Sequence, residues 1–211
     1  MKTELHLNTW NRKEHFRFFS NMQEPFFGIV IEVDCTKAYA KAKEQDVSFF
    51  QYYLYQSLRA ANEMECFRYR IEGEQVFCYD AIHAAATIAR ADGTFGFTFM
   101  EYQDSLAAFL PIAAREIAAV QHCTGLRFTD QTSRLDSIHY SVLPWFRFTG
   151  LTHARSFSYP DSSPKISFGK YVQNAGKIML PVAINVHHGL MDAYHVGQFV
   201  ARFEELLNVG I

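Results

Sequence analysis

Residues 180–208 combine the two hydrophobic patterns found along this chain. Leu180 to Val186 form a short apolar run that is rich in β-branched residues, which predicts a buried strand. Apolar residues then recur at helical spacing from Val196 to Leu207 and predict an amphipathic helix. The sequence HHGLMDA, residues 187–193, separates the two elements. Loops held between rigid elements often carry chemistry, so this segment is the first candidate for a site.

The same patterns predict the remaining elements. Strand-like runs occur at 26–34, 67–71, 75–79, 84–89, 94–101, 138–148, 166–173 and 177–186. Helices are predicted after the capping residues Asn11, Thr36, Ser48 and Asp104 or Ser105, and Pro111 implies a kink or a later start in the last of them. Polar segments at 125–137 and 156–164 are predicted loops, and the second, rich in Ser and Pro, is expected at the surface. This mixture favours a two-layer α/β sandwich with a large mixed β-sheet.

Composition limits the classes of protein that fit. A chain of 211 residues with 49% hydrophobic content can bury one core, so we expect a single domain over residues 1–211. The net charge of −2 indicates no basic surface for nucleic acid, and no apolar run approaches the roughly 20 residues of a membrane span. The polar N-terminus and four scattered cysteines favour reduced thiols in a cytoplasmic protein.

The paired histidines admit several interpretations. A histidine titrates near neutral pH and can move a proton. A metal site built from His187, His188, Asp192 and His195 is disfavoured, because adjacent side chains of an extended segment point to opposite sides. A catalytic triad with Ser141 lacks the Gly-x-Ser-x-Gly elbow. Taken alone, a pair of core histidines remains the simplest interpretation.

Four motifs follow one another across nearly the whole chain. They are WNRKEHF at 10–16, SVLPW at 141–145, GKY at 169–171 and LPVAINVHHGLMDAYHVG at 180–197. Together they resemble the chloramphenicol acetyltransferase family, trimeric enzymes that acetylate this antibiotic from acetyl-CoA. The resemblance implies the CoA-dependent acyltransferase fold, acetyl-CoA as co-substrate and no metal. It also implies a homotrimer with active sites at subunit interfaces, a small-molecule hydroxyl acceptor and a part in antibiotic resistance.

The resemblance also assigns chemistry to particular residues. It implies that His188 is the general base, which removes the acceptor's hydroxyl proton for direct attack on the thioester without an acyl-enzyme. His187 is then expected to be structural. Ser141 matches the serine that stabilises the tetrahedral oxyanion, and Ser167 matches a hydroxyl that supports this oxyanion through water.

Further residues match supporting positions of the family. Asp192 and Arg12 match a buried ion pair that holds the histidine loop, whereas Arg12 taken alone would be interpreted as a solvated cation. Lys170 and Tyr171 match residues near the CoA nucleotide, one for phosphate charge and one for adenine stacking.

The acceptor pocket departs from the family pattern. Phe19 and Phe95 match aromatic positions, while Leu151 replaces the usual phenylalanine and His153 the usual leucine. An imidazole in an apolar pocket favours a changed acceptor, since an unpaired polar group there is costly. Ala193 replaces the family's glycine after the aspartate, so strain is expected if that position needs positive φ.

Two alternatives remain open at this stage. The first is acyl transfer to a different hydroxyl or thiol acceptor. Dihydrolipoamide acyltransferase cores share the paired histidines, but this chain has no lipoyl domain or Pro/Ala-rich linker. The second is a non-catalytic ligand-binding relative, disabled by Ala193. Joint retention of His188, Ser141, Asp192 and Arg12 argues against it.

Overall fold

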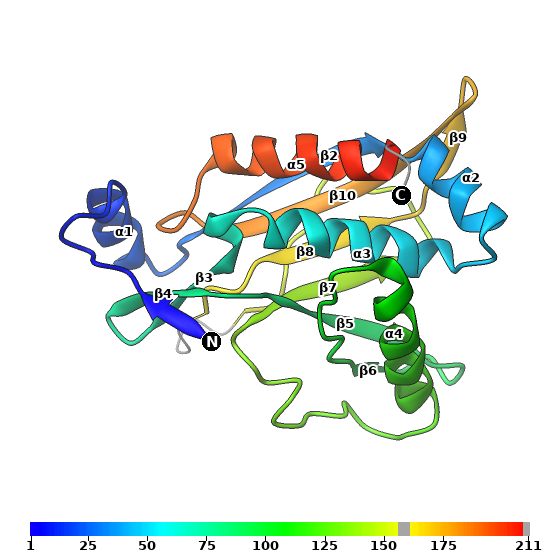
Figure 1. Cartoon of the computed structure of the whole chain (residues 1–211), viewed down its shortest axis with the longest axis horizontal. Helices are drawn as coiled ribbons and strands as arrows, with labels where there is room; N and C mark the ends of the chain where they lie inside the picture. Colours follow the sequence, from blue (N-terminus) through cyan, green and yellow to red (C-terminus); the bar gives the residue numbers. More distant parts are fainter. Residues whose placement is uncertain (156–160, 209–211) are drawn as a thin grey trace.

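A mixed sheet of seven strands forms the body of the molecule (Figure 1). The computed structural model describes residues 1–155 and 161–208. The strand order is β2-β10-β8-β7-β5-β6, with β9 also paired to β10. Its strands are β2 (Phe26–Asp34), β5 (His83–Ala89), β6 (Phe95–Phe97), β7 (Ser137–Leu143), β8 (Lys165–Gly169), β9 (Val172–Asn174) and β10 (Lys177–His187). The predicted two-layer α/β architecture with a large mixed sheet is confirmed.

Helices cover one face of this sheet (Figure 1). They are α2 (Thr36–Glu44), α3 (Phe49–Asn62), α4 (Leu106–Gln121) and α5 (Ala193–Asn208). The ring of Phe168 in β8 lies 4.7 Å from that of Tyr53 in α3 and 6.2 Å from that of Phe203 in α5, measured between centroids. All three side chains are buried, so the main core lies between the sheet and these helices.

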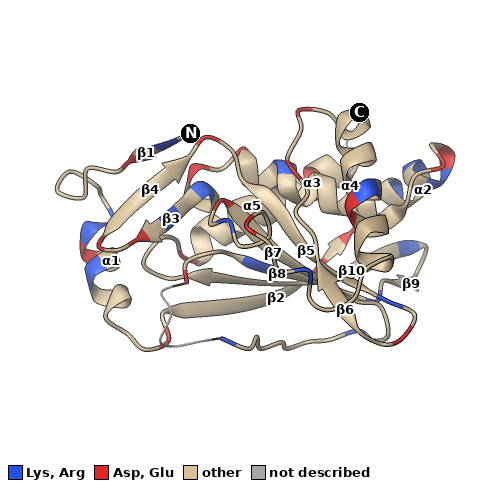
Figure 2. Ribbon diagram, turned by 90° about the horizontal axis from the view of Figure 1, so that it is seen from below, with Lys and Arg blue, Asp and Glu red and all other residues tan. Residues whose placement is uncertain are grey.

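The other face of the sheet carries small and polar side chains. Ser141 is the register partner of Ser167, and Ser167 is the partner of Ala183. Since alternate residues of a strand point to opposite faces, these three lie on the side away from the helix-facing Phe168. The segment 144–155 runs along this side of the sheet (Figure 2). Figure 2 also shows acidic and basic residues interspersed.

A smaller sheet of three strands lies beside the large one (Figure 1). Its strand order is β1-β4-β3, with β1 at Lys2–Glu4, β4 at Gln75–Tyr79 and β3 at Tyr69–Glu72. The predicted hairpin is thereby confirmed, except that a 3-10 helix over Glu65–Arg68 takes its first two residues. Helix α1 (Lys13–Ser20) lies at this end of the molecule.

Some predicted boundaries were wrong. Helix α1 begins after Arg12 and not after Asn11, and no side chain caps it. The predicted start of helix α4 after Ser105 is confirmed, whereas the later start that Pro111 suggested is wrong: the helix begins at Leu106, and the Ser105 hydroxyl accepts a hydrogen bond from the Ala108 amide at 3.3 Å. This cap satisfies one of the free amides at the helix start.

The loop predicted at 156–164 was wrongly assigned to the surface in its second half. Ser162 and Ser163 are buried. The Ser162 hydroxyl accepts from the Ile71 amide at 2.9 Å and ties this segment to β3. Residues 156–160 lie outside the described part of the chain.

The predicted free thiols are confirmed. None of the four cysteines, Cys35, Cys66, Cys78 and Cys123, forms a disulfide. Within residues 1–155 and 161–208, no helix has the length and apolar content needed to cross a bilayer.

Candidate active site

The paired histidines point to opposite sides at the end of β10. The ring of His187 packs edge-on against Phe26, 5.5 Å between centroids. The ring of His188 packs instead against Phe19 at 3.9 Å and Phe27 at 4.6 Å. The two imidazoles therefore cannot converge on one ion, as the extended geometry of the strand predicts.

The backbone of His188 is held on both sides. Its amide donates to the carbonyl of Pro25 at 2.8 Å, and its carbonyl accepts from Nη2 of Arg12 at 3.1 Å. The ring is stacked on Phe19 with only 9° between the planes. Nδ1 is buried and has no hydrogen-bond partner among the described residues. Aromatic stacking on Phe19, and not a hydrogen bond to Nδ1, therefore orients the His188 ring in this chain.

His187 has a structural environment. It is only 3% exposed, and burial lowers its pKa to about 4. The ring is therefore neutral near pH 7, and its Nδ1 accepts a hydrogen bond from the Gly189 amide at 3.1 Å. That contact shapes the turn that carries His188. A Cβ on Gly189 would lie 3.0 Å from the His187 ring, so glycine permits this turn.

Arg12 and Asp192 form an ion pair behind the histidine turn. Nη1 of Arg12 donates to Oδ2 of Asp192 at 2.7 Å, although 180 positions separate the two residues. Arg12 is buried, with 9% of its surface exposed. Burial acts to raise the pKa of Asp192, but hydrogen bonds from Arg12 and His195 outweigh it and hold this pKa well below its usual range. The carboxylate is therefore charged at neutral pH.

We expect Asp192→Asn to destabilise the fold. The change leaves the buried Arg12 guanidinium without a counter-charge, at a cost of about 2–3 kcal/mol because Asp192 is itself partly exposed. A depressed carboxyl pKa contributes stability above the unfolded-state value and loses it as pH falls. The variant's loss in free energy of unfolding, measured with urea, should thus be largest at neutral pH and should shrink below about pH 4.

The matched control for this change is Glu14→Gln, which removes an exposed carboxylate from α1. The control should unfold at the wild-type urea concentration. If Asp192→Asn and wild type have the same free energy of unfolding at pH 7, the ion pair does not stabilise the fold as proposed.

Ser141 and Ser167 place two hydroxyls side by side on neighbouring strands. Ser141 is half-buried, and the hydroxyl oxygen of Thr87 lies 3.3 Å from its Oγ. Ser167 is fully buried, and its Oγ has no hydrogen-bond partner in the described part of the chain. A buried hydroxyl without a partner is suited to hold a water molecule or a polar ligand atom.

Ser141 and His188 do not meet within one chain. Ser141 pairs with Ser167, which pairs in turn with Ala183, so the three residues lie in one row across the sheet. His187 lies four residues beyond Ala183 along β10. Four residues span about 13 Å and two strand spacings about 10 Å, so some 16 Å separates Ser141 from the end of β10. His188 moreover contacts Phe27, whose register partner Val186 faces the helices. Ser141 lies on the opposite face.

Lys170 and Tyr171 lie nearer to Ser141 and Ser167 than to the end of β10 that carries the histidines. Both follow β8 directly, on the side of Ser167 that points away from His187. Lys170 is exposed, and Tyr171 is 41% exposed. The Tyr171 ring packs on Tyr39 at 5.4 Å, which fixes one of its faces and leaves the rest accessible.

The four predicted acceptor residues are dispersed in one chain. Phe19 contacts His188, whereas Phe95 lies 47% exposed on the edge strand β6. Leu151 and His153 are half-buried after β7. Nε2 of His153 is buried without a hydrogen-bond partner among the described residues, and burial and the charge of Lys165 lower the pKa of this imidazole.

The strain expected at Ala193 is absent. Ala193 is the exposed first residue of α5, and it is not among the residues with positive φ. A helical backbone accepts an alanine methyl without cost, so the replacement of glycine does not distort the turn. The sequence suggested His195 only as a metal ligand, and its hydrogen bond to Asp192, three residues before it, was not predicted. Its place in the first turn of a helix begun by an aspartate was the available signal.

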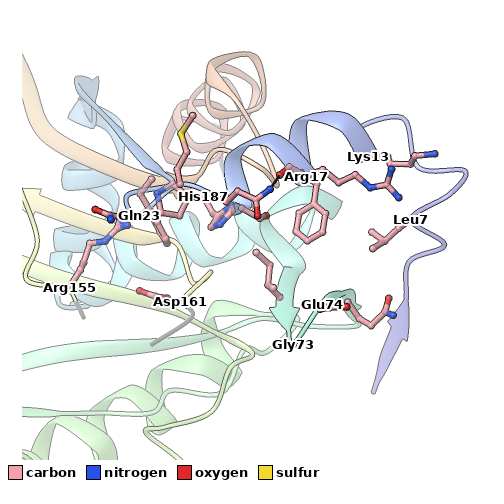
Figure 3. Close-up of a pocket in the computed structure, with 17 residues that line it drawn as sticks. Leu7, Lys13, Arg17, Gln23, Gly73, Glu74, Arg155, Asp161 and His187 are labelled. Carbon is pink, nitrogen blue, oxygen red and sulfur yellow. Dashed lines mark hydrogen bonds between the residues drawn. The ribbon is translucent and has the colours of Figure 1, made fainter. Parts of the chain in front are cut away.

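A cavity of about 730 Å³ lies between α1, the β3–β4 turn and the start of β2 (Figure 3). Figure 3 shows Lys13 and Arg17 of α1 and Glu74 of the turn on its walls. Of the two paired histidines, His187 lines this cavity and His188 does not. The predicted catalytic residues therefore do not gather there.

Comparison with known proteins identifies the class and then the family. A solved structure from Listeria monocytogenes, described as a probable dihydrolipoamide acetyltransferase, shares the fold, with a TM-score of 0.67, 12% identity and coverage of 92% of this chain and 88% of that chain. The fold is thus that of the acyltransferases. A solved chloramphenicol acetyltransferase matches with a TM-score of 0.91 and 32% identity over 98% of this chain and all of that chain.

Sequence relatives agree with this structural match. The chloramphenicol acetyltransferase of Bacillus pumilus is 29% identical, covering 93% of this chain and 89% of its own length. A family profile described as chloramphenicol acetyltransferase matches residues 1–204. The chain therefore belongs to the chloramphenicol acetyltransferase family and is an enzyme of the acyltransferase type.

Proposed function

We propose that this protein transfers the acetyl group of acetyl-CoA to a hydroxyl of chloramphenicol or of a related small molecule. The observation that carries the proposal is the turn at His188, whose backbone is bonded to Pro25 and Arg12 and whose ring is stacked on Phe19. A general base has to be presented in one fixed orientation. Membership of the family supports the same conclusion.

The reaction follows in two proton transfers. The neutral imidazole of His188 takes the proton of the acceptor hydroxyl while the oxygen attacks the thioester carbonyl. The carbonyl oxygen becomes an oxyanion, which the Ser141 hydroxyl stabilises by donating a hydrogen bond. The intermediate then expels the CoA thiolate, which receives the proton from His188, and the ester of the acceptor is formed. Ser167 supports the oxyanion through water, in keeping with its buried, unpartnered hydroxyl.

The site is assembled from two chains. We name Ser141, Ser167, Lys170 and Tyr171 the serine half-site, and His188 with Phe19, Arg12 and Asp192 the histidine half-site. Because the two half-sites are too far apart in one chain, each active site takes one of them from each of two neighbouring subunits. A homotrimer with cyclic symmetry would repeat this contact at every interface and leave no half-site unused.

CoA is bound by the serine half-site. Exposed Lys170 supplies a positive charge for its phosphates, and the accessible ring of Tyr171 supplies a stacking surface for adenine. Four free thiols fit a reducing compartment such as the cytoplasm.

His153 favours a second candidate acceptor. Its buried Nε2 would face an apolar acceptor without a partner, which is unfavourable. An acceptor that offers this nitrogen a polar group would bind better. Acetylation of another hydroxyl acceptor is therefore the second candidate function.

The test follows release of free thiol from acetyl-CoA with and without chloramphenicol, with mass analysis of the product. Release that depends on chloramphenicol, together with a product heavier by one acetyl group, supports the first candidate. Release only with other hydroxyl compounds supports the second. CoA binding without turnover on any acceptor would overturn both and indicate a ligand-binding relative.

A further inference from the structure

The carboxylate of Asp192 is bonded at both oxygens. Oδ2 accepts from Arg12, as described above, while Oδ1 accepts from the amide of Tyr194 at 3.0 Å. Oδ1 also lies 2.8 Å from Nδ1 of His195. Asp192 thus precedes α5 as its capping residue and receives a further donor from the third residue of the helix.

The pairing defines the tautomer of His195. An ionised carboxylate can only accept hydrogen bonds, so at 2.8 Å the Nδ1 atom of His195 must carry the proton. The amide of Asp192, 3.3 Å from the same Nδ1, is then no partner for it. His195 also lines a separate cavity of about 680 Å³, together with Arg12 and Gln198. Nδ1 is therefore committed to Asp192.

The contact between His195 and Asp192 is linked to the His188 backbone through Arg12. His195 fixes one oxygen of Asp192, and the other oxygen fixes Nη1 of Arg12. Nη2 of the same guanidinium donates to the His188 carbonyl at 3.1 Å. A guanidinium is planar and rigid, so a rotation of Asp192 moves the donor to His188 as well. A shift of about 1 Å at a catalytic group can cost about 100-fold in rate.

We propose that His195 is a positioning residue for His188 and acts through Asp192 and Arg12. The proposal rests on the proposed function, since it assigns His195 to the reaction that His188 performs. His195 belongs to neither half-site, so its loss should lower kcat and leave both KM values unchanged.

Three variants test the proposal. His195→Asn places an amide nitrogen near the position of Nδ1 and should restore the bond to Asp192. His195→Gln carries its amide too far out, and His195→Ala has no donor. We expect His195→Gln and His195→Ala to lower kcat about tenfold, because each loses one hydrogen bond to a charged group. His195→Asn should keep most of the wild-type kcat. Gln198→Ala is the matched control, because Gln198 lies on the same helix and its side chain donates to the Tyr194 hydroxyl and, within residues 1–155 and 161–208, to no other group.

Additivity separates positioning from general damage. In an Asp192→Asn background, His195→Ala should add little to the loss of kcat, because both changes break the same chain of contacts. Losses that multiply, full kcat in His195→Ala, or an Asn variant as impaired as the Ala variant would each overturn the proposal.

A readout without turnover keeps this proposal apart from the proposed function. In protein labelled with ¹⁵N-histidine, the wild-type His195 signal should report a proton on Nδ1. The His188 signals should move in His195→Ala and stay in place in His195→Asn. If the wild type turns over no acceptor, the proposed function fails, and unmoved His188 signals in His195→Ala would by themselves overturn the positioning role.

Discussion

Replacing His188 with alanine is expected to lower kcat for acetyl transfer by about 10²–10⁴-fold, because a positioned general base contributes a factor of this size. The fold should survive, since the loss of the stack on Phe19 costs only about 0.5–1.5 kcal/mol beyond the area it buries. Initial rates of thiol release at saturating acceptor measure the first effect, and thermal unfolding measures the second.

The control for this change is His15→Ala, which removes an exposed histidine from α1. It should keep the wild-type rate. Binding of acetyl-CoA, followed by calorimetry, should be the same in both variants, because the serine half-site is untouched. Acetyl transfer by His188→Ala at a tenth or more of the wild-type rate would contradict the assignment of the base, since loss of a general base costs at least about 100-fold.

Ser141→Ala is expected to lower kcat by about 10²–10³-fold, the usual effect of losing one donor to an oxyanion. KM for acetyl-CoA should change little, because the hydroxyl interacts with charge that develops only in the transition state. The hydroxyl of Thr87, 3.3 Å from the Ser141 hydroxyl, would replace it in part.

Ser167→Ala provides a comparison within the same pair of strands. Its hydroxyl acts through water in the proposed reaction, so the loss of rate should be smaller than for Ser141→Ala. A Ser141→Ala enzyme that keeps kcat within about threefold of wild type would show that the oxyanion has another donor, because a true donor costs far more.

The regular elements nearest the site were the most predictable from sequence. The β-branched runs at β2 and β10 define strands by local pattern alone, and β2 was predicted with the boundaries that the structure shows. The turn after β10 is a candidate site from sequence alone, because histidine and aspartate side chains lie between a clearly predicted strand and a clearly predicted helix. These features depend on neighbouring residues, which the sequence contains directly.

Features that depend on distant contacts were not accessible in this way. Arg12 would be interpreted as a solvated cation from its neighbours alone, and only the fold brings it 2.7 Å from Asp192. The separation of Ser141 from His188 follows from the order of strands in the sheet, which hydrophobic patterns do not encode. The expected strain at Ala193 was wrong because the helix begins at that residue.

In the proposed enzyme, His188 of one subunit and Ser141 of its neighbour form one active site. Ser141→Ala and His188→Ala chains carrying different tags can be co-expressed, and trimers that contain both can be isolated on the two tags. Each mixed trimer holds one site with an intact His188 and an intact Ser141, so we predict about one third of the wild-type activity, since cyclic symmetry gives three equivalent interfaces. Mixed trimers no more active than either single variant would contradict the shared site.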